Sequence, residues 1–306
     1  MTSTQYDVLI IGGGFAGLSA ALYTARGMKR ALVCSAGPSR NAPSLHTHGV
    51  LTRGGTPPTE FLAMAQVELD RYDVPRRNSR VVQLTGENNA FMATLENGDT
   101  VQARKIILAT GVRDVLPENI PGLREEWGRG VHHCPYCYGW EVQGGPIALY
   151  QPGLNADHVQ TLLYHQKISS DLLVCSDTTP DLSAVHRQLL HDRGITLLDA
   201  PLVEVKGTAS GVRLIFADGM TSERSVLYAH GERVLQADLA QQLGCEFTAA
   251  SITVDAQQAT SVPGVYAAGD VSSGNQVIFA LASGAKAAMY VGYALFDDDL
   301  PAGTKV

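Results

Sequence analysis

Two cysteines separated by two residues form the most reactive pattern in the chain. They are Cys134 and Cys137, within the stretch that runs from Val131 to Glu141. Cysteines at this spacing can close a disulfide within one turn of chain, and the helix dipole stabilises a thiolate at the start of a helix. Pro135 fits the first position of such a helix. The pattern therefore predicts a redox-active dithiol.

The same spacing also forms half of many zinc sites. A tetrahedral site needs two more ligands, and the chain has no second Cys-x-x-Cys. His132 and His133 abut the cysteines too closely to complete a tetrahedral cage easily. We therefore expect redox chemistry and no metal.

A glycine-rich loop near the N-terminus predicts a dinucleotide site. It follows an apolar segment expected to be a strand, residues 6–11, and precedes an amphipathic helix expected at residues 18–26. Glycines permit the tight turn and the close approach of a pyrophosphate, which then lies at the positive end of the helix. The candidate cofactor-binding residues of this loop are Gly12, Gly14, Phe15, Ala16 and Gly17.

Other segments supply the rest of the expected cofactor site. A buried strand from Lys105 ends in a turn of small residues, against which a cofactor can lie. Asp270 is placed to bond a cofactor polyol, and a helix starting near Gln276 would direct its N–H groups at an electron-rich ring. These features indicate a flavin beside the dithiol. The further cofactor-binding candidates are Ser35, Arg40, Asn41, His48, Val82, Ala109, Thr110, Gly111, Gly269, Asp270, Gln276 and Val277.

A second nucleotide-type domain is expected in the middle of the chain. Its strand at residues 145–150 leads into a turn with Gln151 and Pro152 where a phosphate-binding loop would have glycines. Proline has no N–H to offer a phosphate, and no arginine cluster follows the next expected strand, residues 171–175. We expect this domain to keep the fold but not to bind a nicotinamide nucleotide.

The domain order is that of an α/β protein with two Rossmann-like domains. We expect a discontinuous FAD domain at residues 1–115 and 235–306, and an inserted domain at residues 116–234 that carries the dithiol. Residues 117–122 are expected to link them. Within the first domain, a short strand is expected at residues 101–103 and a buried strand that ends in the small-residue turn at residues 105–111.

Composition limits the function classes. The formal charge of −7 leaves no basic stripe for phosphates, which argues against a nucleic-acid partner. The chain enters a strand within a few residues, and its apolar runs are shorter than a membrane span. We therefore expect a cytoplasmic protein without a signal peptide or a membrane partner. Cys34, Cys175 and Cys245 stand alone in apolar surroundings and are expected to be inert.

Taken together, these motifs resemble those of the low-molecular-weight thioredoxin reductase family, over nearly the whole chain. The matching residues are Gly12-x-Gly14-x-x-Gly17, Ala109-Thr110-Gly111, Cys134-x-x-Cys137 and Ala268-Gly269-Asp270 followed by Gln276. More narrowly, the segments Arg40–Pro43 and Val131–Glu141 are similar to a branch of dithiol oxidases that close the disulfides of gliotoxin, holomycin and romidepsin.

The resemblance implies non-covalent FAD, a homodimer and distinct roles for the two cysteines. Cys137 would face the flavin, and Cys134 would point outward and exchange with substrate. Thioredoxin reductases have an acid/base aspartate after the second cysteine, where this chain has Tyr138. Tyrosine, with a pKa near ~10, is a poor base at neutral pH. We therefore expect His133 as the catalytic base and Glu141 as the second candidate.

Three functions stay open at this stage. The first is an oxidase that takes two electrons from a small-molecule dithiol and passes them through FAD to O2. The second is a disulfide reductase fed by a pyridine nucleotide or ferredoxin, and the third is a flavoprotein that only binds or regulates. The altered second loop speaks against NADPH, and the intact Cys-x-x-Cys speaks against a purely structural role.

Overall fold

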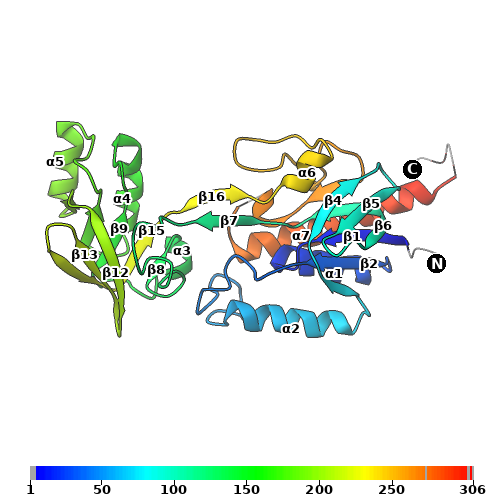
Figure 1. Ribbon diagram of the computed structural model, residues 1–306, viewed down its shortest axis with the longest axis horizontal. Coiled ribbons are helices and arrows are strands. Elements are labelled where there is room, and N and C mark those ends of the chain that lie inside the picture. The colour runs from blue at the N-terminus through cyan, green and yellow to red at the C-terminus, as the bar shows by residue number, and fades with distance from the viewer. Residues whose placement is uncertain (1–4, 273, 302–303, 305–306) are drawn as a thin grey trace.

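The chain forms two lobes joined by a two-stranded ribbon, as the computed structural model shows (Figure 1). The structure describes residues 5–272, 274–301 and 304. The two ends of the chain meet in the first lobe, and the middle of the chain forms the second. The extreme ends of the expected FAD domain, residues 1–4 and 305–306, lie outside the described residues.

The first lobe is built on a seven-stranded sheet in the order β3-β2-β1-β6-β5-β4, with β17 beside β6. Its strands are β1 (Gln5–Ile11), β2 (Ala31–Ser35), β3 (Arg76–Asn78), β4 (Val81–Thr85), β5 (Phe91–Leu95), β6 (Thr100–Leu108) and β17 (Val265–Ala267). Its helices are α1 (Phe15–Arg26), α2 (Pro58–Asp70), α6 (Asp238–Gln242) and α7 (Val277–Asp299), with a 3-10 turn η2 (Gly269–Val271).

Strand β1 lies at the centre of this sheet and is buried on both faces. Val8 and Ile10 belong to the apolar cluster formed with α1 and α7, whereas Leu9 and Ile11 belong to the cluster on the other face, which includes α6. All four side chains are at most 5% exposed. A strand covered on both faces needs a continuous apolar run, which explains the composition of this segment.

Two sequence expectations are corrected in the first lobe. The strands expected at residues 101–103 and 105–111 are one strand, β6, which ends at Leu108 and pairs antiparallel with β5 and parallel with β1. Arg104 stays within it, because neither glycine nor proline interrupts the chain there. Helix α1 begins at Phe15, directly after the glycine loop, and not at Leu18.

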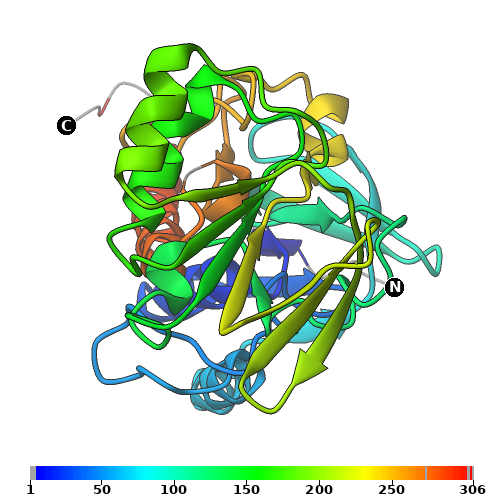
Figure 2. The ribbon, with the colours of Figure 1, turned by 90° about the vertical axis from the view of Figure 1, so that its left-hand side faces the viewer.

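The second lobe has helices on one side of a parallel sheet and a small antiparallel sheet on the other (Figure 2). The parallel sheet has the order β11-β10-β9-β15-β8, and the antiparallel one the order β12-β13-β14. The strands are β8 (Val131–His132), β9 (Ile147–Tyr150), β10 (Leu172–Cys175), β11 (Thr196–Leu198), β12 (Leu202–Thr208), β13 (Gly211–Phe216), β14 (Thr221–Arg224) and β15 (Val226–Ala229). The helices are α3 (Pro135–Tyr138), η1 (Ala156–His158), α4 (Val159–His165) and α5 (Ala184–Asp192).

The ribbon between the lobes consists of β7 (Val112–Val115) and β16 (Glu232–Leu235), which pair antiparallel. Residues 117–122, expected to be the linker, instead pack into the second lobe. Ile120 is 2% exposed, and a Cβ on Gly122 would lie 1.7 Å from the carbonyl oxygen of Val205. The link between the lobes is therefore the ribbon and not a loop.

Helix α7 corrects the expectation that no apolar run approaches membrane-spanning length. It has 23 residues, and an 18-residue window within it has a mean hydropathy of 1.3, so by length and composition alone the helix could cross a membrane. One face packs against α1, where a Cβ on Gly284 would lie 2.1 Å from the carbonyl oxygen of Ala16. In this fold α7 is a core helix of the first lobe with one face exposed.

Candidate active site

The glycine loop holds its predicted residues in close contact. Gly12 has a φ of +119°, and a Cβ there would lie 2.1 Å from the carbonyl oxygen of Ala109. A Cβ on Gly17 would lie 1.8 Å from the carbonyl oxygen of Gly12. Helix α1 starts after Gly14 without a side-chain cap. Its N-terminal N–H groups are therefore available to a phosphate, as the glycine spacing predicts.

The second half of the expected cofactor site lies against the first. A Cβ on Gly269 would be 2.8 Å from the Cβ of Ala16, and the N–H of Gly269 donates to the Ser283 hydroxyl at 2.9 Å. On the other side of the loop, a Cβ on Gly13 would lie 2.7 Å from the Oγ of Ser35. The structure thus brings together turns from both ends of the chain.

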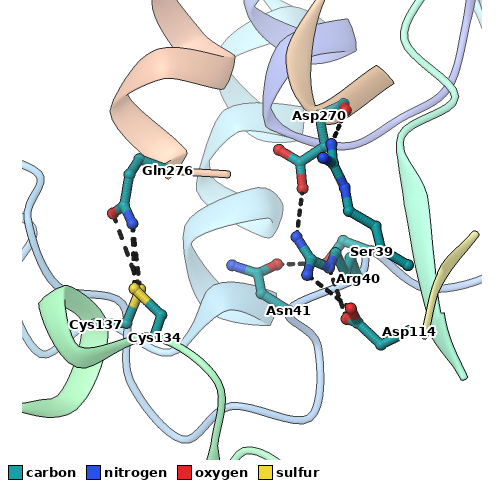
Figure 3. Close-up of polar contacts among 9 residues, drawn as sticks. Ser39, Arg40, Asn41, Asp114, Cys134, Cys137, Asp270 and Gln276 are labelled. Carbon is teal, nitrogen blue, oxygen red and sulfur yellow. Dashed lines mark hydrogen bonds and ion pairs between the residues drawn. The ribbon is translucent and has the colours of Figure 1, made fainter. Parts of the chain in front are cut away.

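A network of arginines and carboxylates surrounds Asp270 (Figure 3). The guanidinium of Arg40 donates two hydrogen bonds to Asp114, both 2.7 Å long, and one of 2.9 Å to Oδ2 of Asp270. Arg233 donates to the Asp270 carbonyl oxygen at 2.5 Å. Burial raises the pKa of the Asp270 carboxyl, and the bond from Arg40 opposes that rise. The sequence predicted Arg40 and Asp270 as site residues but not Asp114 and Arg233. The last two lie on the two-stranded ribbon, whose pairing the sequence did not predict.

The dithiol of the second lobe lies beside the start of α7 in the first (Figure 3). Gln276 is the N-cap of α7, and its Nε2 lies 3.3 Å from the sulfur of Cys134 and 3.6 Å from that of Cys137. Cys134 in turn is the N-cap residue of α3, with Pro135 at its first position. The dithiol and the expected flavin site are therefore one site, built across both lobes.

The two thiols differ in how readily they ionise. Cys137 donates a hydrogen bond to Cys134, and Gln276 and two backbone N–H groups donate to it as well, so the pKa of Cys134 is lowered to about 6 although burial raises it. The same interaction with Cys134, together with burial, raises the pKa of Cys137. Of the reduced pair, Cys134 is the thiolate at neutral pH.

Alkylation of the reduced protein by iodoacetamide should therefore follow a midpoint near pH 6 at Cys134. An unperturbed thiol would give a midpoint near ~8.5, because only the thiolate reacts. The modified cysteine is identified by mass spectrometry at a series of pH values. Cys134→Ser should lack the phase seen at low pH, and a wild-type midpoint above pH 8 would contradict the assignment.

The exposure of the two thiols differs from the expectation that Cys134 points outward. Cys134 is 9% exposed, whereas Cys137 is half-buried. Cys134 is the N-cap residue of α3 and lies 3.3 Å from Nε2 of Gln276, whereas Cys137 lies within α3. The distinct roles of the two cysteines stay a prediction, which variants that lack one cysteine can test.

The two candidate bases lie in different surroundings. The ring of His133 stacks on Trp127 with centroids 5.6 Å apart, and its pKa is lowered to about 4, chiefly by burial and then by the charge of Arg40. Such an imidazole is a weak proton acceptor. Glu141 lies 3.5 Å from Nδ1 of His48, which belongs to the other lobe. Tyr138 stacks on His132 with centroids 4.0 Å apart.

Other predicted cofactor residues have positions that the sequence did not reveal. The Phe15 ring is 7% exposed and packs on Phe61, and Val277 also contacts the core, so both side chains serve packing. The hydroxyl of Thr110 donates to the carbonyl oxygen of Gln236 at the end of β16. The turn of Thr110 and Gly111 is thereby fixed to the ribbon.

Asn41 and Val82 are two further residues that the sequence predicted to bind the cofactor. Asn41 follows Arg40 and accepts a hydrogen bond of 3.0 Å from Ser39 (Figure 3). Val82 lies on β4, at the edge of the sheet opposite β3, and its carbonyl oxygen accepts from Gln242. No interaction of Val82 with the glycine loop occurs within the described residues, so its role stays a prediction.

In the second lobe, the chain's own groups occupy the turn that would bind a nucleotide. The N–H of Gly153 donates to the Ser176 carbonyl oxygen, and Pro152 has no N–H. The side chain of Asn155 caps η1 in a capping box. Asp157 then adds a negative charge in the first turn of η1, where it opposes a phosphate. The sequence indicated the proline but not the cap.

The three lone cysteines are buried. Cys34, Cys175 and Cys245 are at most 6% exposed, and burial raises the pKa of each thiol. They are therefore unreactive, as expected. Within residues 5–272, 274–301 and 304, no three His, Cys, Asp or Glu side chains gather as a metal site would require.

Comparison with known proteins matches this architecture to a family. The family model described as pyridine nucleotide-disulphide oxidoreductase matches residues 6–288. The thioredoxin reductase sirT of Leptosphaeria maculans is 32% identical over 98% of both chains. Among solved structures, an oxidoreductase from Agrobacterium tumefaciens has a TM-score of 0.88 at 30% identity, covering 97% of this chain and all of its own. HlmI has a TM-score of 0.89 at 32% identity, covering 96% and 94%.

The chain belongs to the pyridine nucleotide-disulphide oxidoreductase family and is a thioredoxin reductase-like flavoprotein disulfide oxidoreductase. Its cofactor is FAD, as predicted. The residues present fit that cofactor, because the uncapped start of α1 suits the pyrophosphate. Oδ1 of Asp270, which has no hydrogen bond within the described residues, suits a polyol hydroxyl.

Asp270→Ala should weaken FAD retention. Loss of a hydrogen bond to a carboxylate costs about 1.5–3 kcal/mol, which corresponds to roughly 10- to 100-fold weaker binding. The ratio of flavin to protein absorbance after gel filtration measures the effect. Asp297→Ala, an exposed carboxylate on α7, is the control. Equal flavin content in both variants would contradict the role of Asp270.

Proposed function

We propose that this protein oxidises a small-molecule dithiol to an intramolecular disulfide, with FAD as the first electron acceptor and O2 as the second. One observation carries the proposal. The dithiol lies at the flavin end of the first lobe, 3.3 Å from Gln276, while the nucleotide turn of the second lobe is filled by its own Asn155 and Pro152. Electrons can reach the flavin from a thiol substrate, whereas this turn, which lies within the described residues, offers no free phosphate cradle for a nicotinamide donor.

Two successive thiol–disulfide exchanges would oxidise the substrate. A substrate thiolate attacks the sulfur of Cys134 in the enzyme disulfide, which forms a mixed disulfide and releases Cys137 as a thiolate. The second substrate thiolate then attacks the substrate sulfur of the mixed disulfide, which closes the product disulfide and releases Cys134. FAD supplies a two-electron acceptor that O2 reoxidises. In sum, a dithiol and O2 give a disulfide and H2O2.

Aromatic side chains beside the dithiol support a small, largely apolar substrate. Tyr136 and Trp140 flank Cys137 along the chain and are 74% and 79% exposed. Large aromatic rings that are left exposed next to a reactive pair offer a surface for an apolar or ring-shaped partner. Relatives named thioredoxin reductases support disulfide exchange as the chemistry of this site.

Oxygen uptake measured against disulfide formed is the decisive experiment. With reduced gliotoxin as a surrogate dithiol in air, we expect one O2 consumed and one H2O2 released for each disulfide, without added nicotinamide. Catalase should return half of the oxygen, which identifies the peroxide. If reduced flavin instead persists in air for minutes while NADPH or reduced ferredoxin drives disulfide reduction, the protein is a reductase.

We also propose a homodimer. The exposed face of α7 is rich in large apolar side chains, which a second copy of the chain would cover. They are Phe279, Met289, Tyr293 and Phe296, each at least 47% exposed. Light scattering that gives a monomer mass at micromolar concentration would reject the dimer.

A further inference from the structure

A histidine of the first lobe and a glutamate of the second form a pair at the junction of the lobes. Nδ1 of His48 lies 3.5 Å from Oε1 of Glu141, and the two side chains are 23% and 27% exposed. Glu141 follows Cys137 by four residues and lies in the turn that comes after α3. Thr47, next to His48, exchanges backbone hydrogen bonds with Thr56 and Gly55, which fixes the loop.

The second ring nitrogen of His48 has no hydrogen-bond partner in the part of the chain that the structure describes. Nε2 is buried and makes no hydrogen bond within the described residues. Leaving a buried polar atom unsatisfied costs about 1–3 kcal/mol, so such an atom needs a partner, which can be a water molecule, a ligand or a reacting group. A histidine held by a carboxylate at one nitrogen has the other free to take a proton, and the carboxylate stabilises the charged ring that results. The pair therefore has the form of an acid/base unit.

The neighbouring groups are less suited than His48 to accept a proton. Tyr138 occupies the position after the second cysteine, but its ring stacks on His132. His133 stacks on Trp127 in buried surroundings that disfavour its charged form. Other titratable groups near the pair include His132 and His46, whose rings are held by the carbonyl oxygens of Arg129 and Gly55. Tyr228, which interacts with the charge of Glu141, donates its hydroxyl to the Tyr138 carbonyl oxygen.

We propose that His48, positioned by Glu141, accepts the proton of the substrate thiol that attacks the enzyme disulfide. The inference rests on the proposed function and names the base of its thiol half-reaction. Two thiol protons leave the substrate for each disulfide formed. One passes to His48, whose ring becomes an imidazolium paired with Glu141, and the other stays on the reduced cysteine pair. The imidazolium returns its proton to water before the next turnover.

The test is the anaerobic thiol half-reaction, in which dithiothreitol bleaches the flavin band in a stopped-flow instrument. At pH 7 His48→Ala should react about 10²- to 10⁴-fold more slowly, the range expected for loss of a general base. The limiting rate at high dithiol concentration should fall, whereas the dithiol concentration that gives half of the limiting rate should not change. Added imidazole should restore part of the rate, and the deficit should shrink above pH ~8.5, where the dithiol supplies its own thiolate. Glu141→Gln should lose less, because the ring remains.

His46→Ala is the matched control, since this neighbouring histidine is exposed, and it should react like wild type. Reoxidation by air should be unchanged in every variant. A His48→Ala rate equal to wild type, or a loss that neither imidazole nor high pH repairs, would overturn the inference. A loss of this size in His133→Ala but not in His48→Ala would also overturn the inference. Because the half-reaction needs no oxygen, it can succeed even if O2 is not the acceptor, so the two proposals fail separately.

Discussion

Replacing either cysteine of the dithiol with serine should abolish disulfide formation, with a loss of at least ~10³-fold, as is typical when a covalent nucleophile is removed. FAD content should not change, because neither sulfur belongs to the glycine loop. The two variants should differ in their spectra. If Cys137 faces the flavin, Cys134→Ser leaves a thiolate beside it and gives a long-wavelength charge-transfer band, whereas Cys137→Ser does not.

The spectra of the two variants at neutral pH decide the assignment. Cys175→Ser, which changes a buried thiol in the second lobe, is the control and should keep both turnover and the wild-type spectrum. A band in Cys137→Ser alone would exchange the roles of the two cysteines. That outcome would agree with the lowered pKa of Cys134 and would make Cys137 the sulfur that meets the substrate.

NADPH should reduce the flavin very slowly or not at all under anaerobic conditions. A phosphate-binding turn supplies charge-assisted hydrogen bonds worth about 1.5–3 kcal/mol each, and two lost bonds weaken binding by roughly 10²- to 10⁴-fold. Here Pro152 has no N–H, the N–H of Gly153 is used by Ser176, and Asp157 adds repulsion. Stopped-flow absorbance of the flavin band measures the rate.

A variant that removes only the repulsive charge provides the control for this prediction. Asp157→Ala removes the negative charge but leaves Pro152 in place, so it should not create reduction by NADPH. Fast bleaching of wild-type flavin by NADPH would show that the nucleotide binds elsewhere in the second lobe. That result would favour the reductase function without contradicting the assignment of the dithiol site.

Local sequence patterns predicted the parts of this fold that depend on neighbouring residues. The glycine loop, the apolar β1 and the Cys-Pro turn each carry their own signal, because a φ of +119° at Gly12 or a strand buried on both faces restricts residue type directly. The family and its FAD followed from the same motifs.

Features made by distant segments left no such signal. Strands β7 and β16 are four residues each and pair across the whole inserted lobe, so nothing in either strand indicates its partner. The contacts of Asp114 and Arg233 around Asp270 depend on that pairing. The contact between His48 and Glu141 likewise exists only because the two lobes meet. Burial, which lowers the pKa of His133, is also a property of the folded chain.

The ribbon of β7 and β16 has a consequence for protein engineering. Val115 pairs with Glu232, so the chain enters and leaves the second lobe at neighbouring residues. A lobe attached at such a point can be exchanged as a cassette, because its ends already meet the spacing that the host requires. Chimaeras that keep residues 112–115 and 232–235 and take the intervening segment from a relative would transplant one chain's dithiol onto another chain's flavin domain.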